Sequence, residues 1–352
     1  LVYDQFDRLV RMEYPSKTRA AGATNPDDRE EYDYDPNGNR TFWRKRSGDT
    51  FTYGFNALDQ MTSKSVTGHP ELDVTYEWDP AGRPTSATFT ATGQGVSYGY
   101  DSARRQVAET TMGRGVGWQL DKAGNRFELT WPGGAKVNYD FDAAGRVTAI
   151  KEPGATSGPG LLATFGYDDL GRRQTLSRGN GGHGAYGYDA AGRLDALTQA
   201  GAAGQPASIQ TIGYTPASQI AAFSQQTPAY VHTMRPPARS LTFNGLNQDH
   251  AIAILAGGYD ANGNLVRHTD RTFGYDVENR LVSATSGGGG QSLSLKYDPL
   301  GRLYATESGA TSTYFLQEGS RLIGEYADAT TTSPLRRYVH GTGVDEPMIW
   351  YE

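Results

Sequence analysis

Residues 187–194 read GYDAAGRL and bring together side chains that are able to do chemistry. Asp189 offers a carboxylate, Arg193 a guanidinium and Tyr188 a phenol. Such a loop suits metal binding or acid–base chemistry at Asp189, but it equally suits a turn in which Asp189 bonds the backbone. The number of copies distinguishes these interpretations, because an active site is normally unique whereas a scaffold element recurs.

The pattern recurs in fourteen copies, usually 20 to 26 residues apart, with extremes of 16 and 31. Weaker copies start at Tyr3, Phe55, Tyr100, Leu120, Tyr214 and Phe243. In the eight clearer copies we expect the following residues to form a structural turn: Tyr34, Asp35, Gly38, Trp78, Asp79, Gly82, Arg83, Phe141, Asp142, Gly145, Arg146, Tyr167, Asp168, Gly171, Arg172, Tyr188, Asp189, Gly192, Arg193, Tyr259, Asp260, Gly263, Tyr275, Asp276, Asn279, Arg280, Tyr297, Asp298, Gly301 and Arg302.

The six positions of each copy are called slots here, counted from its aromatic residue. Three of these slots show which residue types the turn requires. The first slot is aromatic in thirteen copies, and the second is Asp, Asn or Thr, each of which accepts a bond from a nearby backbone N–H. The fifth slot is Gly in eight copies and Asn or Asp in four, the types that best tolerate a left-handed backbone. Arg104 and Ser218 depart from this rule and mark the two least certain copies.

The sixth slot holds Arg in eight copies, Asn in three and Gln in three, and never Lys or an acid. A requirement for positive charge would admit Lys, so the slot favours a planar group that bonds the aspartate or carbonyls, or stacks on a ring. Pairing of Arg with Asp is one option. The neutral Asn and Gln indicate that hydrogen bonding is the shared role.

The residues around the turns predict strands. Residues 136–150 and 292–308 alternate apolar and polar side chains on both sides of a turn, and no window of helical length carries a sustained apolar period. The predicted fold class is all-β: a ribbon of strand, turn and strand, with a left-handed Gly as a bulge. We expect one array over 1–352, regular over 1–199 and again over 241–352. Residues 200–240, rich in Ala, Gly and Pro, form a loop or loosely paired insertion, and 286–292 form a flexible hairpin tip.

Composition excludes several functions. The net charge of −6 disfavours nucleic acid as the main partner. The lack of cysteine rules out disulfides and thiol chemistry. No apolar run is long enough to span a membrane. The six histidines have no metal-ligand spacing, and GNGGHG from Gly179 precedes another turn rather than a helix. Asn39 heads a glycosylation sequon, which matters only if the producing cell glycosylates. We expect no catalytic, cofactor-binding or metal-binding residue and no cofactor.

Fourteen copies of aromatic-Asp-x-x-Gly-Arg resemble the YD repeats of the RHS family, which is similar in architecture to Tc toxin C components and teneurins. The resemblance is closest at FNGLNQ from Phe243, at the repeats from Tyr259, and at RRYVHGTGVDEPMIWYE from Arg336. It implies a ribbon that spirals into a hollow shell around a C-terminal toxin. The family's self-cleaving Asp-Pro-x-Gly-Leu element normally lies beyond this chain. DPLGRL from Asp298 is superficially similar, but Arg302 replaces the final Leu and the stretch fits the turn register.

The resemblance leads to a functional hypothesis. We expect a non-catalytic, secreted or cell-surface bacterial shell segment of a longer array, whose partner is its own C-terminal toxin, effector or plug. The alternative is a surface adhesion or glycan-binding module or filament, in which the partner is a surface glycan or another chain. The third reading, an enzyme, is disfavoured because no unique polar constellation is visible, and a buried pair of aspartates would revive it. Whether the array closes into a shell is left open.

Overall fold

The computed structural model describes residues 1–16, 24–201, 205–231, 241–253, 257–287, 290, 292–341, 343 and 346–352. It is all-β and antiparallel, as expected from the alternating pattern. The only α-helix in the described part of the chain is the single turn α1 (His250–Ala253). Short 3-10 turns also occur, at Pro70–Leu72, Pro132–Gly134, Gly158–Gly160 and Pro228–Tyr230. The chain forms two compact units, one of Leu1–Gly115 with Ala238–Arg336 and the other of Val116–Pro237 with Arg337–Glu352.

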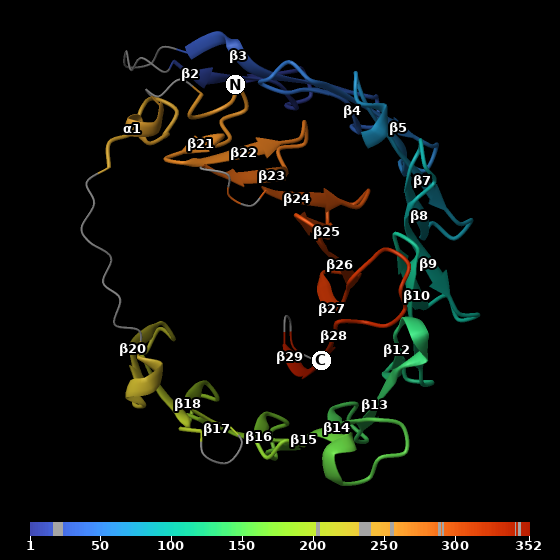
Figure 1. Cartoon of the computed structure of the whole chain (residues 1–352), viewed down its shortest axis with the longest axis vertical. Coiled ribbons are helices and arrows are strands. Elements are labelled where there is room, and N and C mark those ends of the chain that lie inside the picture. The colour runs from blue at the N-terminus through green and yellow to red at the C-terminus, as the bar shows by residue number, and fades with distance from the viewer. Residues whose placement is uncertain are drawn as a thin grey trace. The chain divides into compact units, whose positions relative to one another are not determined.

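The first unit contains two meanders, in each of which every strand pairs with the next along the chain (Figure 1). The earlier one consists of β1 (Val2–Tyr3), β2 (Leu9–Pro15), β3 (Thr24–Tyr34), β4 (Arg40–Arg44), β5 (Thr50–Phe55), β6 (Met61–Val66), β7 (Val74–Trp78), β8 (Pro84–Phe89), β9 (Gly95–Tyr100) and β10 (Gln106–Thr111). The later one consists of β21 (Arg267–His268), β22 (Arg271–Tyr275), β23 (Leu281–Ser286), β24 (Ser292–Tyr297), β25 (Leu303–Ser308), β26 (Thr311–Glu318) and β27 (Arg321–Tyr326).

The second unit contains one meander and a C-terminal hairpin. The meander consists of β11 (Arg114–Leu120), β12 (Arg126–Thr130), β13 (Lys136–Phe141), β14 (Val147–Lys151), β15 (Leu161–Tyr167), β16 (Arg173–Arg178), β17 (His183–Tyr188), β18 (Leu194–Ala200), β19 (Ser208–Tyr214) and β20 (Ile220–Gln225). The hairpin pairs β28 (Arg336–His340) with β29 (Pro347–Tyr351). β11 and β28 begin at the boundaries between the units.

Buried apolar side chains alternate with more exposed ones along the strands, and the buried ones form the core of each unit. In β13, Val137 and Tyr139 are buried while Lys136 is exposed, which matches the period of two in the sequence. The first unit buries Phe51, Val66, Val74, Ala87, Val96, Ala305, Leu316, Ile323 and Tyr326. The second buries Val116, Leu129, Trp131, Val137, Tyr139, Val147, Ala149, Ile150, Leu162, Ala163, Phe165, Leu176 and Val339.

The structure differs from expectation within 200–240. β19 and β20 form a regular hairpin there, and residues 214–219 form the same turn as the other repeats, although their second and fifth slots hold Thr215 and Ser218. Residues 202–204 and 232–240 of this interval, and 288, 289 and 291 of the expected hairpin tip, lie outside the described residues.

Candidate functional site

The turn at Asp189 shows how the motif residues are used. The Asp189 carbonyl accepts a bond from the Gly192 N–H at 2.9 Å, and the Asp189 N–H donates to the Arg193 carbonyl at 2.9 Å. One carboxylate oxygen accepts from the backbone N–H groups of Ala191 and Arg193, and the other accepts from Arg193 Nε at 2.7 Å. Together with the positive φ of Gly192, this is a type I turn closed by a glycine bulge. Both carboxylate oxygens of Asp189 therefore serve the turn itself.

The fifth slot is left-handed in all fourteen copies, with φ between +59° and +93°. Arg104 and Ser218, which looked exceptional in the sequence, adopt φ of +67° and +62° and donate their N–H groups to the carbonyls of Asp101 and Thr215. The two least certain copies are therefore members of the same repeat. Their turns keep the geometry despite a side chain that disfavours it.

The sixth slot is paired with the second by hydrogen bonds. Arg and Asn in the sixth slot donate to the second oxygen of Asp, as Arg83 does to Asp79 at 2.7 Å and Asn125 does to Asp121 at 2.9 Å. Where the second slot is Asn, the donor and acceptor exchange: Asn56 and Asn244 donate to the side-chain oxygens of Gln60 and Gln248, at 2.8 and 2.9 Å. The pairing of Asn with Gln is visible in the sequence and was the signal that could have shown this exchange.

A second set of contacts links six of the turns to the next repeat, and it includes the ring stacking that the sequence left as an option for the sixth slot. The slot-six guanidinium lies over the slot-one ring of the following copy, at 4.2 Å for Arg83 over Tyr100 and 4.7 Å for Arg146 over Tyr167. The same tyrosine hydroxyl donates to the carbonyl that follows the arginine, as Tyr167 does to Val147 at 2.8 Å. Equivalent hydroxyl bonds are made by Tyr34, Tyr100, Tyr188, Tyr214 and Tyr297.

The electrostatics of the turn favour ionised aspartate. The side-chain bond from Arg193, followed by its backbone N–H, lowers the pKa of Asp189 below its ordinary value. In Asp79 the backbone N–H of Arg83 is the larger cause, and its guanidinium the next. Because the folded pKa is depressed, these groups stabilise the fold above the unfolded pKa of about 4 and lose that contribution as pH falls through the folded pKa.

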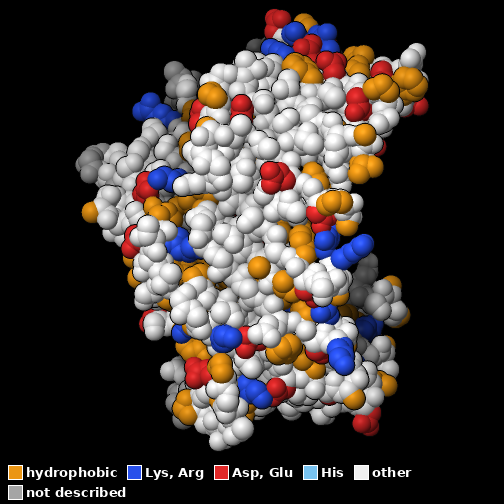
Figure 2. Space-filling model, turned by 90° about the vertical axis from the view of Figure 1, so that its right-hand side faces the viewer, with side chains coloured by type: hydrophobic (Ala, Val, Ile, Leu, Met, Phe, Trp, Pro, Cys, Tyr) orange, Lys and Arg blue, Asp and Glu red, His pale blue; other side chains and the backbone are white. Residues whose placement is uncertain are grey.

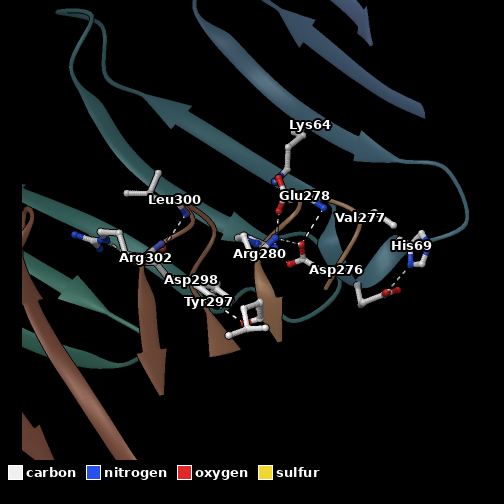
Figure 3. A network of polar contacts seen from close by, with 12 residues as sticks. Lys64, His69, Asp276, Val277, Glu278, Arg280, Tyr297, Asp298, Leu300 and Arg302 are labelled. Atoms are coloured by element: carbon white, nitrogen blue, oxygen red, sulfur yellow. Dashed lines mark hydrogen bonds and ion pairs between the residues drawn. The ribbon is translucent and has the colours of Figure 1, made fainter. Parts of the chain in front are cut away.

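In the first unit, turns of the later meander dock on strands of the earlier one (Figure 3). Lys64, on β6, forms an ion pair with Glu278 at 2.7 Å, next to the turn in which Asp276 bonds Arg280. Lys45 is 1% exposed, and its Nζ donates to the Val277 carbonyl at 2.7 Å. Burial lowers the pKa of Lys45. These lysines were not predicted, because their partners lie more than 200 residues away in sequence.

The first unit also contains two buried acidic residues, Glu109 and Asp298, although they are not the pair of aspartates that would favour an enzyme. Glu109 is 2% and Asp298 0% exposed, and Arg302 lies between them, donating to Glu109 through Nη1 at 2.6 Å and to Asp298 through Nε at 2.7 Å. The other Glu109 oxygen accepts from the Gly319 N–H at 3.0 Å. All four carboxylate oxygens have donors in this arrangement, because Asp298 also accepts from two backbone N–H groups of its turn. The pair is thus arranged as a structural link.

In the second unit the C-terminal hairpin β28–β29 and the residues between its strands reach several strands of the meander. Glu346 forms an ion pair with Arg173, and the Tyr139 hydroxyl donates to the His340 carbonyl at 3.1 Å. Burial acts to raise the pKa of Glu346, but the Arg173 bond and the Gly343 N–H together outweigh it, so the pKa of Glu346 is lowered. The GNGGHG stretch forms the turn between β16 and β17, so a strand follows it rather than a helix.

Two cavities are large enough for a small molecule. One, of about 680 Å³ in the second unit, is lined mainly by apolar groups and glycines around Leu162, Met348 and Trp350. The other, of about 460 Å³ in the first unit, is lined by Tyr275, Tyr297 and Tyr304 together with charged residues. Its Asp276 and Arg280 are bonded to each other, and its Lys296 to Glu307. These polar groups of the second cavity are therefore bonded within the protein, whereas Arg178 and Asn180 are the polar side chains in the lining of the first.

Other candidate sites have structural explanations. Across the described residues, no three His, Asp or Glu side chains are placed to hold a metal ion; His232 and the side chain of His250 are not among those described. Asn39, in the sequon, donates its amide to Asp35 and Asp59, at 2.9 and 2.8 Å. Among the helices described, none has the length and apolarity to cross a membrane. Figure 2 shows basic and acidic side chains interspersed over the face it presents.

Comparisons with known proteins agree with the repeat. The family model described as RHS Repeat matches residues 259–291, which include two of the clear copies. This stretch is an RHS repeat. The resemblance to the RHS/YD-repeat family noted from the sequence is thereby confirmed, and the other copies share the geometry of the matched ones. No curated protein matches the chain by sequence.

Solved structures extend the similarity over most of the chain. The chain is similar to a chain in the crystal structure of TcdB2-TccC3, with a TM-score of 0.60 and 10% identity over 86% of this chain. A crystal structure of TcdB2-TccC3-TEV (TM-score 0.45, 11% identity, 91% of this chain) and the Tc holotoxin pore of Photorhabdus luminescens with mutation TccC3-D651A (0.34, 12%, 86%) also match. The chain spans 22%, 18% and 15% of those three chains. The likeness to the first is one of fold.

Proposed function

We propose that this chain is a non-catalytic wall segment of an RHS-type shell that encloses or displays a C-terminal toxin or effector polypeptide. The observation that carries the proposal is the row of turns whose polar groups bond one another. Asp, Arg and Tyr, the residues with catalytic potential, are committed in copy after copy to holding strands together. The fold similarity to TcdB2-TccC3 supports the same role.

The proposal includes location and partner. A shell that delivers a toxin acts outside the producing cell, so we propose that the protein is secreted or exposed on the surface of a bacterium. Its partner is a polypeptide of its own product or an associated toxin component. A wall needs no cofactor, and we propose none.

Cryo-electron microscopy of the intact protein that carries these repeats tests the proposal, combined with protease digestion of the native sample. The expected result is density for a polypeptide inside a closed wall, and a segment that resists protease until the wall is unfolded. An open ribbon with nothing enclosed and no protected segment would overturn it. Binding on a glycan array by that open ribbon would favour the adhesion alternative.

A further inference from the structure

The cavity of about 680 Å³ in the second unit lies between the C-terminal strand β29 and the ends of two strands of the meander. Met348 and Trp350 line it from β29, while Arg178 and Ala200 are the last residues of β16 and β18. All its lining residues belong to the second unit and to the described part of the chain. Its volume lies within the range of roughly 300–1,000 Å³ that is typical of small-molecule sites.

The polar side chains of this lining offer hydrogen-bond donors. Arg178 is the only charged residue of the lining, and its half-buried guanidinium makes no hydrogen bond or ion pair with any residue that the structure describes. Asn180 accepts the Gly182 N–H with its side-chain oxygen at 3.0 Å, and its amide nitrogen donates to no described residue. The guanidinium and the amide N–H groups are therefore available to a ligand.

No carboxylate of the protein takes the place of that ligand. The lining contains no Asp or Glu. Glu346 interacts electrostatically with Arg178, but its two oxygens accept from Arg173 and from the Gly343 N–H. Arg173 thus neutralises Glu346, and the positive charge of Arg178 is left without a bonded partner among the described residues. A guanidinium in this position favours an anion, since its bonds to a carboxylate are charge-assisted and can be bidentate.

The rest of the lining is apolar or small. Leu162 is buried, Met348 and Ile349 add aliphatic surface, and Trp350 is 59% exposed. Glycines at 179, 182 and 201 add no side-chain bulk. An indole ring beside aliphatic groups suits a flat apolar body, because aromatic rings pack favourably on one another in offset or edge-on arrangements.

We propose that this cavity binds a small organic acid, in which a carboxylate is attached to a flat apolar body. Arg178 binds the carboxylate, Asn180 adds a donor, and the body packs against Leu162, Met348 and Trp350. A cationic ligand would meet the charge of Arg178 with no acid in the lining to offset it. A neutral apolar ligand would fill the same space but would leave the guanidinium without an anion.

Isothermal titration calorimetry of the chain with naphthaleneacetate tests the proposal, with naphthaleneacetamide as the neutral counterpart of the same shape. The acid should bind at least about tenfold more tightly than the amide, because hydrogen bonds to a charged group are about twice as strong as neutral ones. Arg178→Gln should reduce the affinity for the acid to that for the amide and leave the amide unchanged. Trp350→Ala should weaken the binding of both.

Lys122→Gln is the matched control, because it removes an equal charge from an exposed residue outside the lining. It should leave both affinities unchanged, and circular dichroism establishes that all variants are folded. No saturable binding of the acid, equal affinities for acid and amide, or an acid affinity insensitive to Arg178→Gln would each overturn the proposal. An equal loss in Lys122→Gln would also overturn it, since net charge would then explain the effect. None of these results depends on whether the protein encloses a cargo.

Discussion

Gly192 and Arg104 occupy the same slot of the turn, with φ of +82° and +67°. The left-handed region costs a residue with a Cβ roughly 1–2 kcal/mol, and a β-branched residue more. We therefore expect Gly192→Val to lower the free energy of unfolding by at least this amount, measured by thermal and urea denaturation. Ala191→Val, at the exposed preceding position, is the control and should cost less. A melting temperature equal to wild type would contradict the role assigned to Gly192.

The same slot also predicts a change of opposite sign. Arg104 is exposed and has a left-handed backbone, which is unfavourable for a residue with a Cβ. Arg104→Gly should therefore stabilise the protein. The gain is limited to about 1 kcal/mol, because glycine makes the unfolded chain more flexible by about 0.5–1 kcal/mol. Destabilisation by Arg104→Gly would mean that its side chain makes a contribution larger than the backbone strain.

At the scale of the element, the strands and turns were predictable but the links between repeats were not. The residue types required at slots two and five depend on local contacts, since Asp189 bonds residues two and four positions away. A comparison of the fourteen copies within the one chain therefore reveals them. The hydroxyl bond from Tyr167 to Val147 joins residues 20 positions apart. The aromatic preference of slot one was visible, but its partner depends on how neighbouring hairpins align, which the sequence pattern does not specify.

Tyr167→Phe isolates this inter-repeat link. The phenyl ring keeps its place under Arg146, while the hydrogen bond to the Val147 carbonyl is lost. We expect a loss of about 0.5–1.5 kcal/mol in the free energy of unfolding, measured by urea denaturation. Tyr3→Phe is the control: this slot-one hydroxyl is exposed and makes no hydrogen bond within the part of the chain that the structure describes, so its removal should cost almost nothing. Equal effects of the two changes would exclude a specific role for the Tyr167 hydroxyl.

At the scale of the whole molecule, each unit combines segments that are distant in sequence. Glu109 and Arg302, which are 193 positions apart, meet in the first unit, and Arg173 and Glu346 meet in the second. Such contacts have no periodicity, so an isolated acidic residue on a strand gives no sign that it is buried. The sequence therefore predicted an all-β array with no candidate active site, but it did not predict which charged residues connect the early and late repeats.

Glu109→Gln tests whether this connection holds the two meanders of the first unit together. The change keeps the shape of the side chain but leaves the partly buried Arg302 guanidinium with one carboxylate instead of two. Breaking a buried ion pair costs about 3–5 kcal/mol, whereas an exposed pair contributes about 0–1 kcal/mol. Glu307→Gln, which removes the more exposed pair with Lys296, is therefore the matched control. We expect only Glu109→Gln to speed hydrogen exchange both in β10 and in the turns around residues 298–302 and 319, because the contact joins them. Faster exchange in β10 alone would show that the later meander is held by other contacts, such as Lys45 with Val277 and Lys64 with Glu278.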